Sequence, residues 1–459
     1  MIKLNNDILL IIFQEFQYDL KTLYSCLLIN KICCETTIPI LWKNPWILKK
    51  EKEKLLFQVI ISHLSDDSRN NLNKSIKILT YQKPLFDYIK FCRHLNFEKI
   101  IKIIDIHIPS EKQNLSIKNE IFNLFINENT KFTHLYLPYQ FDYQIHLIPG
   151  AKCCFSEIEF LSCGTKINVN ILDGLAGICK SIKELELLME EHNGNDNYGI
   201  VRLIESQKKL VKISLYGSYA DKSFREALKN SLIKHADSIQ YFKTNNQPTT
   251  NILSYFKNLK ILKLTNNYQS KWNCLKDLSL PLLQILNARY VPINALSSLI
   301  ENTSDQLIEI KIGYIIHDEI ENKRIIQAIY QHCPNLRYLQ LFVRNSNIRE
   351  FEKLLIKCQY LKGLYIIIND ISYDWNNLFE ILAKSSPPSL FKFKFNLCYT
   401  YYIKLESLKL FFDSWRGRHP MLLQIYYLKG VEDLMENYKS EGIIKKYDNW
   451  LHGKVFEWP

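Results

Sequence analysis

Cysteine and histidine are the residues of this chain that could bind a metal ion or supply a nucleophile and a base. The sequence holds 12 cysteines and 11 histidines among 459 residues. Two cysteine doublets, Cys33-Cys34 and Cys153-Cys154, lack a second Cys or His pair at the spacing of a zinc site, and no Cys-x-x-Cys occurs. The count is too low for a disulfide scaffold. We therefore expect reduced, mostly buried thiols, no metal site and no cofactor.

Motifs of familiar enzyme classes do not occur either. Gly174-Leu-Ala-Gly177 lacks the Lys-Ser/Thr that follows in a phosphate-binding loop, and neither Gly-x-Ser-x-Gly nor His-Glu-x-x-His is present. His94, His134 and His332 are read as surface or capping residues. The sequence therefore favours a protein that is not an enzyme. An unrecognised enzyme is one alternative, and it would need a pocket with converging titratable groups.

A short strand pattern recurs along most of the chain, with apolar residues at the first, fourth and sixth positions of a segment. Twelve such segments start at intervals of 20 to 32 residues, at Phe132, Ile158, Ile182, Leu210, Ile239, Leu259, Leu282, Leu307, Leu336, Leu361, Leu390 and Leu422. In a chain with 47% hydrophobic residues, one such segment is easily met by chance. The near-constant interval is therefore the informative feature, and it is typical of the Leu-x-x-Leu-x-Leu strand of leucine-rich repeats.

Segments with helical spacing separate the predicted strands. Between Lys323 and Cys333, for example, Ile325, Ile326 and Ile329 fall on one helix face. One unit of strand, loop and helix cannot bury its apolar side alone, so the units must stack into a common core. We predict an α/β fold in which a leucine-rich-repeat solenoid, a horseshoe of about 12 strand–helix repeats, spans residues 132–430. An ordinary α/β domain is the alternative.

The first 47 residues follow a different pattern, that of short amphipathic helices. The first predicted helix carries an apolar stripe of Leu4, Ile8, Leu9, Ile12, Phe13 and Phe16. The second predicted helix spans residues 20–31, and its apolar residues are Leu20, Leu23, Tyr24, Leu27 and Leu28. A third, short helix starts near Thr36 or Thr37 and ends at Leu41-Trp42, before Pro45. Three helices of this size are marginally stable alone and usually need a partner or a neighbouring domain.

These residues resemble an F-box. The pattern of that family is matched at Leu4-Asn5, Ile8-Leu9, Ile12-Phe13, Phe16, Leu23-Tyr-Ser-Cys26-Leu-Leu-Ile29-Asn30-Lys31 and Leu41-Trp42. Asn5 departs from the usual Pro, and Cys33 stands where the family prefers Trp. Both departures reduce adaptor affinity or module stability in principle. The match covers residues 4–46, about a tenth of the chain.

An F-box followed by leucine-rich repeats resembles the substrate receptors of Skp–cullin–F-box ubiquitin ligases. That resemblance implies docking onto a Skp-type adaptor, and through it onto a cullin–RING ligase. It assigns the docking contacts to Leu4, Ile8, Leu9, Ile12, Phe13, Leu23, Leu27 and Ile29. The repeats would hold the protein to be ubiquitinated. Two alternatives stay open: residues 1–47 are an inert cap on the solenoid, or the chain is a repeat scaffold without a ubiquitin role.

Two further segments complete the predicted domain organisation. Residues 48–131 are expected to form a helical bridge and a degenerate first repeat, with a strand near residues 91–97. Residues 431–459 are expected to form a C-terminal cap or tail. The sequence does not choose between those two roles, and it does not indicate the oligomeric state.

The predicted binding surface of the repeats is basic. Positions two, three and five of each segment should face the concave side of the solenoid, because successive side chains of a strand alternate. From residue 239 onward these positions include Lys243, Lys260, Lys263, Lys311, Arg337, Tyr338, Lys362, Tyr365 and Lys394. Such a surface suits an acidic or phosphorylated partner protein of unknown identity. The alternative is that the lysines keep the sheet face hydrated.

The remaining partner classes are not expected. The net charge is +12, but no nucleic-acid-binding module accompanies it, so nucleic acid is not the predicted partner. No run of 18 apolar residues predicts a membrane span. Residues 1–7 lack the layout of a secretory signal. Together with the predicted reduced thiols, these features predict a location in the cytoplasm, the nucleus or both.

Overall fold

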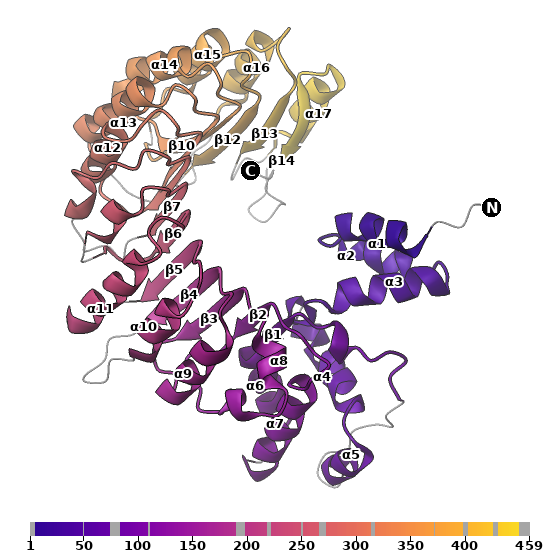
Figure 1. The fold of residues 1–459 in the computed structure, drawn as a ribbon. Helices are drawn as coiled ribbons and strands as arrows, with labels where there is room; N and C mark the ends of the chain where they lie inside the picture. The colour runs from indigo at the N-terminus through magenta and orange to yellow at the C-terminus, as the bar shows by residue number, and fades with distance from the viewer. Residues whose placement is uncertain are drawn as a thin grey trace. The chain divides into compact units, whose positions relative to one another are not determined.

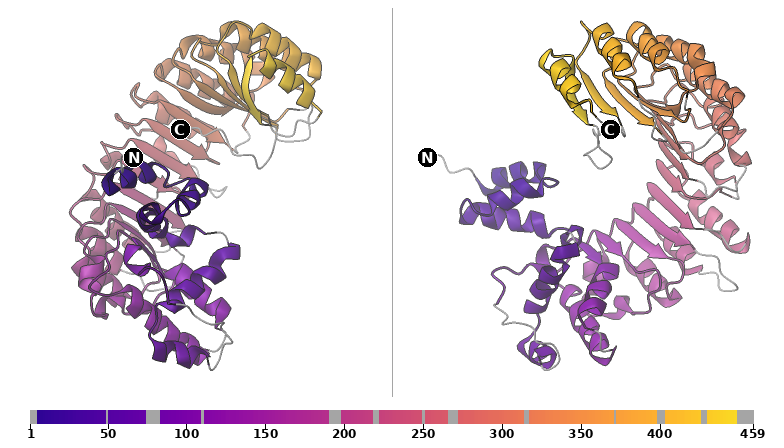
Figure 2. Two further views of the ribbon diagram at one scale, coloured as in Figure 1. Left: turned by 90° about the vertical axis from the view of Figure 1, so that its right-hand side faces the viewer. Right: turned by 180° about the vertical axis from the view of Figure 1, so that it is seen from behind.

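The structure is a computed structural model that describes most of the chain. The described residues are 5–48, 50–73, 83–108, 111–189, 198–217, 222–248, 251–265, 272–313, 317–370, 372–397, 403–425 and 430–448. The chain divides into two compact units, residues 1–235 and 236–459. In each unit parallel strands follow one another in chain order, with helices along one face of the sheet (Figures 1 and 2).

The first unit starts with helices and continues with five strands. Its N-terminal helical elements are α1 (Asn6–Glu15), α2 (Leu20–Cys26), α3 (Lys31–Trp42), η1 (Pro45–Ile47), η2 (Lys50–Lys52), α4 (Glu53–Ser62), α5 (Asp66–Asn73) and η3 (Ile89–Phe91). The strands are β1 (His94–Asn96), β2 (His134–Tyr136), β3 (Phe160–Gly164), β4 (Glu184–Met189) and β5 (Lys212–Gly217). Between and after them lie α6 (Phe97–His107), α7 (Glu111–Phe125), η4 (Ile145–Leu147), α8 (Ala151–Phe155), α9 (Val169–Ile178), α10 (Tyr198–Glu205) and α11 (Lys222–Ile233).

The second unit repeats the alternation of strand and helix. Its strands are β6 (Tyr241–Thr244), β7 (Ile261–Thr265), β8 (Ile285–Arg289), β9 (Glu309–Gly313), β10 (Tyr338–Phe342), β11 (Gly363–Ile368), β12 (Lys392–Leu397), β13 (Met421–Ile425) and β14 (Ile444–Asp448). Its helical elements are η5 (Ile252–Tyr255), η6 (Asn273–Leu275), α12 (Ile293–Glu301), α13 (Glu319–His332), η7 (Asn345–Asn347), α14 (Ile348–Lys357), α15 (Trp375–Ser385), α16 (Leu405–Ser414) and α17 (Glu432–Ser440).

The first, fourth and sixth positions of each repeat segment form the core, as the sequence predicts. Leu259, Leu262 and Leu264 illustrate this, with at most 1% of each side chain exposed. Ile261 and Lys263 alternate with them and are only half-buried, because they point to the sheet face away from the helices. We call this surface, made by segment positions two, three and five, the open face. The predicted α/β repeat architecture is therefore confirmed.

One predicted strand start is wrong by a single residue. Ala288 of β8 lies opposite Leu264 of β7, so this repeat starts at Leu283 and not at Leu282. Accordingly, Leu283 is 0% exposed and Leu282 is 43% exposed. Because adjacent leucines satisfy the apolar pattern in two frames, sequence alone cannot choose between them. A slip of one residue moves every following side chain to the other face of the sheet.

The last predicted strand start is also wrong, by two residues. Ile425 of β13 lies opposite Phe395, the sixth position of the preceding repeat. The segment therefore starts at position 420 and not at Leu422, which is half-buried on the open face. The run Met421-Leu-Leu423 offers apolar residues in every frame, and this again hides the register.

Within each unit, a shared backbone carbonyl joins most repeats to their neighbours. The carbonyl of Lys260 accepts the N–H groups of both Gln284 and Ile285, at 2.9 and 3.0 Å. The same double acceptor recurs at Arg93, Thr133, Glu159, Lys183, Gln240, Gln284, Ile308, Arg337 and Lys362. A carbonyl oxygen has two lone pairs, so one oxygen satisfies two donors and fixes the register between neighbouring strands.

The N-terminal helices take part in the same ladder. Within the first unit, the carbonyl of Lys43 at the end of α3 accepts the N–H groups of Arg93 (2.9 Å) and His94 (3.2 Å). The indole N–H of Trp46 donates to the carbonyl of His94 at 2.5 Å, and Trp42 stacks on Tyr88 at 4.6 Å between ring centroids. The helices are thus hydrogen-bonded to β1, the first strand of the sheet.

The two segments with uncertain roles contain strands. In the predicted bridge, β1 pairs in parallel with β2, in the place where the sequence indicated a degenerate strand. In the predicted cap or tail, α17 is followed by β14, which pairs with β13. Residues 449–459 of that tail lie outside the described residues.

The corrected register predicts a clear difference between two adjacent leucines. Replacement of Leu283 by Ala should lower the free energy of unfolding by roughly 2–5 kcal/mol, because it leaves a cavity in the core. Replacement of Leu282 by Ala should change it by no more than about 0.5 kcal/mol. Chemical denaturation of both variants tests this. A larger loss for Leu282→Ala would restore the frame predicted from the sequence.

Candidate protein-interaction surfaces

Helices α1–α3 form a small module with a core of its own. Phe13, Leu23, Cys26 and Cys33 are buried there, and Leu9, Ile40 and Leu41 pack against them. Each helix is capped by a side chain that accepts a backbone N–H. The caps are Asn5 with Asp7 (3.4 Å), Asp19 with Thr22 (3.3 Å) and Asn30 with Cys33 (2.9 Å). Asn5, the residue that departs from the F-box pattern, therefore serves as an N-cap.

This module exposes many hydrophobic side chains. Its exposed hydrophobic residues are Ile8 (46%), Ile11 (61%), Ile12 (40%), Phe16 (38%), Tyr18 (91%), Tyr24 (47%), Leu28 (87%) and Ile29 (63%). We call this set the module surface. Contiguous exposed apolar residues on a small module mark an interaction site more often than isolated ones do.

The structure sorts the predicted docking residues into three groups. Ile8, Ile12 and Ile29 lie on the module surface. Leu9 and Leu27 are half-buried. Phe13 and Leu23 are 6% and 0% exposed, so they support the surface from within. Leu4 lies outside the described residues.

Two residues of the module surface, Ile11 and Leu28, are missing from the predicted docking residues. Ile11 lies outside the apolar stripe of the first predicted helix, whereas Leu28 belongs to the apolar face of the second; they are 61% and 87% exposed. A large apolar residue on the predicted polar side of a helix is the signal that could have revealed Ile11.

The open face of the first unit is balanced in charge. Lys183 pairs with Glu159 at 2.5 Å, and Lys212 pairs with Glu184 at 2.6 Å, each across neighbouring strands. The hydroxyl of Ser162 donates to the carboxylate of Glu186 at 3.2 Å. These lysines are therefore largely neutralised by their own sheet.

Two histidines on this face form an aromatic stack. The rings of His94 and His134 lie 3.8 Å apart, and Phe160 follows at 5.3 Å from His134. Burial, reinforced by His134 and Lys43, lowers the pKa of His94 to about 3. Burial also lowers the pKa of His134. Both imidazoles are neutral at physiological pH, and they pack in the stack instead of capping a helix.

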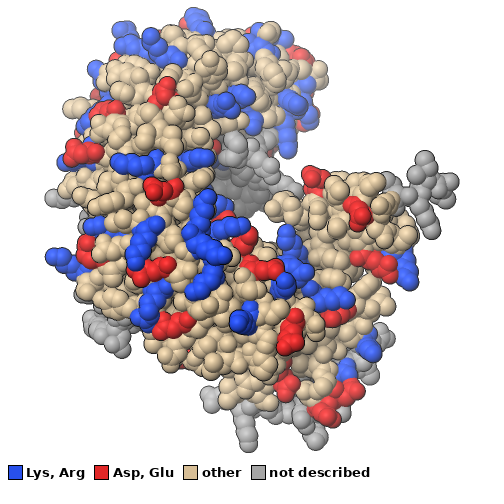
Figure 3. Space-filling model, in the orientation of Figure 1, with Lys and Arg blue, Asp and Glu red and all other residues tan. Residues whose placement is uncertain are grey.

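On the second unit, the predicted basic residues share the open face. Lys243, Lys263 and Lys311 are in register on β6, β7 and β9, with Asn287 of β8 between the last two. Lys260 is half-buried just before β7. Figure 3 shows acidic groups interspersed with basic ones over the visible face, so charge density alone does not single out this group.

The other predicted residues lie further along the same unit. Arg337 and Lys362 are exposed, and Tyr338 and Tyr365 are half-buried. The ammonium of Lys394 lies 4.7 Å from the centroid of the Tyr365 ring, whose hydroxyl accepts a hydrogen bond from Asn396 at 3.1 Å. The ammonium of Lys392 likewise lies 5.5 Å from the centroid of the Tyr338 ring, so both tyrosines contact cations of their own sheet.

The sequence predicted an exposed Lys394, but in the structure this side chain is buried. It is 6% exposed, and its register partner on β13, Gln424, is 1% exposed. Burial, with a smaller effect of Lys311 that Asp448 opposes, lowers the pKa of Lys394 to about 8. The sequence could not show this, because the residues around Lys394 come from neighbouring repeats.

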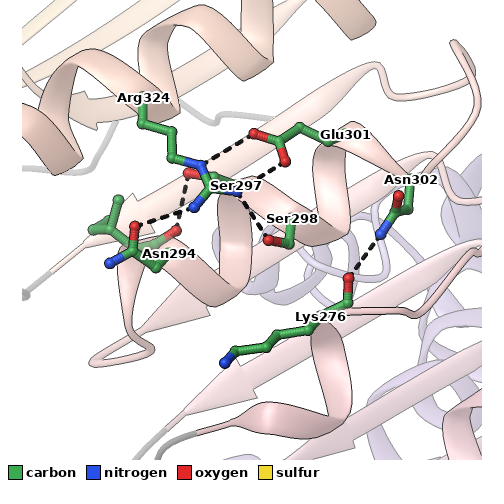
Figure 4. Close-up of polar contacts among 8 residues, drawn as sticks. Lys276, Asn294, Ser297, Ser298, Glu301, Asn302 and Arg324 are labelled. Atoms are coloured by element: carbon green, nitrogen blue, oxygen red, sulfur yellow. Dashed lines mark hydrogen bonds and ion pairs between the residues drawn. The ribbon is translucent and has the colours of Figure 1, made fainter.

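The helix-covered side carries a polar network that is explained by helix packing. Arg324 of α13 reaches across to α12 and donates to Glu301 at 3.2 and 2.9 Å, to Ser298 at 3.1 Å and to Asn294 at 3.4 Å (Figure 4). Asn302 donates to the carbonyl of Lys276 at 2.7 Å. These contacts join adjacent repeats.

Three kinds of feature are absent from the described residues: clusters of metal-binding side chains, disulfides and membrane-spanning helices. No cluster of three or more His, Cys, Asp or Glu side chains among them could hold a metal ion. The eleven described cysteines are free thiols. Within the same residues, no helix has the length and apolar character needed to cross a membrane.

Comparisons with known proteins leave the family open. No protein-family model and no curated protein matches the chain. Among solved structures, a leucine-rich-repeat protein of Leptospira interrogans aligns with a TM-score of 0.33 and 11% sequence identity. The alignment covers 77% of this chain and 92% of the other. A TM-score of 0.33 is too low to support an argument about the fold. The repeat architecture is therefore assigned from the strands and helices of this chain alone.

The low pKa of Lys394 predicts how stability depends on pH. Between about pH 8 and its ordinary pKa of 10.5, the unfolded chain keeps a proton that the folded chain has lost, so stability should rise with pH across this window. Lys394→Met removes the buried charge, so the variant should be more stable than wild type at pH 7. The advantage should shrink toward pH 10. Thermal unfolding at several pH values measures it, and a constant difference would contradict the assignment.

Proposed function

We propose that this protein is the substrate-recognition subunit of a Skp–cullin–F-box ubiquitin ligase. In this proposal the module of helices α1–α3 docks a Skp-type adaptor, and through it a cullin–RING ligase. The repeats hold the protein that is to be ubiquitinated. The chain itself makes and breaks no bond, and it acts in the cytoplasm, the nucleus or both.

The module surface is the observation that supports adaptor docking. A repeat array usually ends in a capping unit with a polar outer face, since nothing covers that face. Here the outer face carries Ile11, Leu28 and Ile29, each more than half exposed at 61%, 87% and 63%. An inert cap would have no use for them. A partner that buries them removes that apolar area from water.

The junction of the module with β1 supports a receptor role. The carbonyl of Lys43 and the indole of Trp46 bind the backbone of the first strand. A partner held on the strands of the first unit would therefore keep a defined distance from the docked adaptor. Ligases of this kind work by raising the effective concentration of the target near the conjugating enzyme, for which a defined distance is useful.

The repeat scaffold without a ubiquitin role is the alternative. In that function the open faces of the two units bind a partner in the same way, but no adaptor binds the module surface. The two functions therefore differ only in what residues 6–42 bind, and one experiment separates them.

Charged substitutions on the module surface should remove the adaptor. The double variant Ile12→Asp, Ile29→Asp would place two carboxylates in the buried interface, at a cost of several kcal/mol, which is a hundredfold loss of affinity or more. Neither residue belongs to the module core, so the fold should persist. Co-purification with a Skp-type adaptor measures the effect, with circular dichroism to check helicity.

The matched control is Leu147→Asp, because Leu147 is also an exposed apolar residue of the first unit, at 71%. Wild type and this control should both retain stoichiometric adaptor. If wild type fails to retain the adaptor, the scaffold alternative is correct. Equal retention by the double variant would place the docking site elsewhere.

A further inference from the structure

The lysines of β6–β9 form a row on the open face of the second unit. Lys243, Lys263, Asn287 and Lys311 are consecutive register partners on four parallel strands. Neighbouring strands lie roughly 4.8 Å apart, so the two adjacent lysines are held about one strand spacing apart at their backbones. We call these four residues the lysine row.

The row concentrates positive charge at Lys263. Its pKa is lowered by burial first and then by the charges of Lys243 and Lys311, with Glu309 opposing. Lys311 is paired with Glu309 at 2.6 Å, and Glu309 is 5% exposed. Among the described residues Lys263 has no carboxylate within ion-pair distance. Like charges held this close repel, and an anion between them relieves the repulsion.

Lys263 is also held in position. Its ammonium lies 5.4 Å from the centroid of the Tyr241 ring. A lysine that rests on an aromatic face loses less freedom when a ligand arrives, so more of the ionic interaction is retained as affinity. Asn287 adds an amide beside it, which can donate to a carboxylate or phosphate oxygen.

The first unit provides the contrast. On its open face Lys183 and Lys212 face Glu159 and Glu184 across the strands, at 2.5 and 2.6 Å. Sheet hydration alone would be served equally well by such pairs. The strands β6–β9 instead place Lys243, Lys260, Lys263 and Lys311 against the single acid Glu309. On these strands the lysines outnumber the acids of the open face.

We propose that the lysine row binds an acidic segment of a partner protein, whose carboxylate or phosphate groups lie against Lys263. This inference rests on the proposed function only in that the repeats hold a protein. The occupant follows from charge complementarity: an extended segment offers an anionic side chain about every 7 Å on one side, which suits cations one and two strand spacings apart.

Binding of short synthetic peptides to the full-length protein tests this inference. Three fluorescent peptides share one sequence, in which alternate positions hold glutamate, phosphoserine or glutamine. At moderate salt, the glutamate or the phosphoserine peptide should bind at least tenfold more tightly than the glutamine peptide. Whichever anion binds more tightly identifies the source of the negative charge in the natural partner. Binding of neither acidic peptide would overturn the proposal.

Matched variants separate the row from the net charge of the protein. Lys263→Gln should weaken the acidic peptide about tenfold, equivalent to about 1.4 kcal/mol. Lys183→Gln removes the same charge from an ion pair of the first unit, and should change affinity by less than about twofold. Equal losses for both variants would mean non-specific attraction and would overturn the proposal. So would tighter binding of a single-stranded oligonucleotide with a steep salt dependence.

The outcome is independent of the adaptor. Lys263→Gln should leave co-purification of a Skp-type adaptor unchanged, because the substitution does not touch the module surface. Loss of the adaptor with intact peptide binding would refute the ligase role alone. Loss of peptide binding with intact adaptor would refute the lysine row alone.

Discussion

The double hydrogen bond to one carbonyl per repeat is the constraint on which the rest of the structure depends. Each of these carbonyls takes two N–H groups from the next repeat, as Lys260 does from Gln284 and Ile285. This fixes which residues of adjacent strands lie opposite each other. The first, fourth and sixth positions then stack into the core of each unit, and the second, third and fifth form the open face. Rows of like residues from different repeats follow from that register.

The same constraint connects the N-terminal helices to the repeats of the first unit. Lys43 provides the carbonyl that β1 would otherwise receive from a preceding repeat. The residues that follow α3 therefore hydrogen-bond to the start of the first strand. The exposed apolar residues of the module take no part in these bonds. In the proposed function they are the residues that dock the adaptor.

Much of the fold was predictable because the pattern is periodic. The apolar triplets Leu259, Leu262, Leu264 and Leu336, Leu339, Leu341 were placed in the correct frame, since most of the residues between them are polar. Prediction failed at Leu282 and Leu422, where adjacent apolar residues allow several frames. The candidate site was less predictable. The exposure of Ile11, the stacking of His94 on His134 and the burial of Lys394 depend on side chains from other helices or repeats. The spacing of residues within one segment carries no information about those partners.

Hydrogen exchange with and without a Skp-type adaptor tests the central claim most directly, namely that α1–α3 form the docking surface. Backbone amides are compared by mass spectrometry over the full chain at saturating adaptor. The account predicts new protection confined to residues 6–42, strongest in α1 and the turn after α2, with β6–β9 unchanged. Protection on the open faces without any change in α1–α3 would contradict it, and so would a uniform absence of protection.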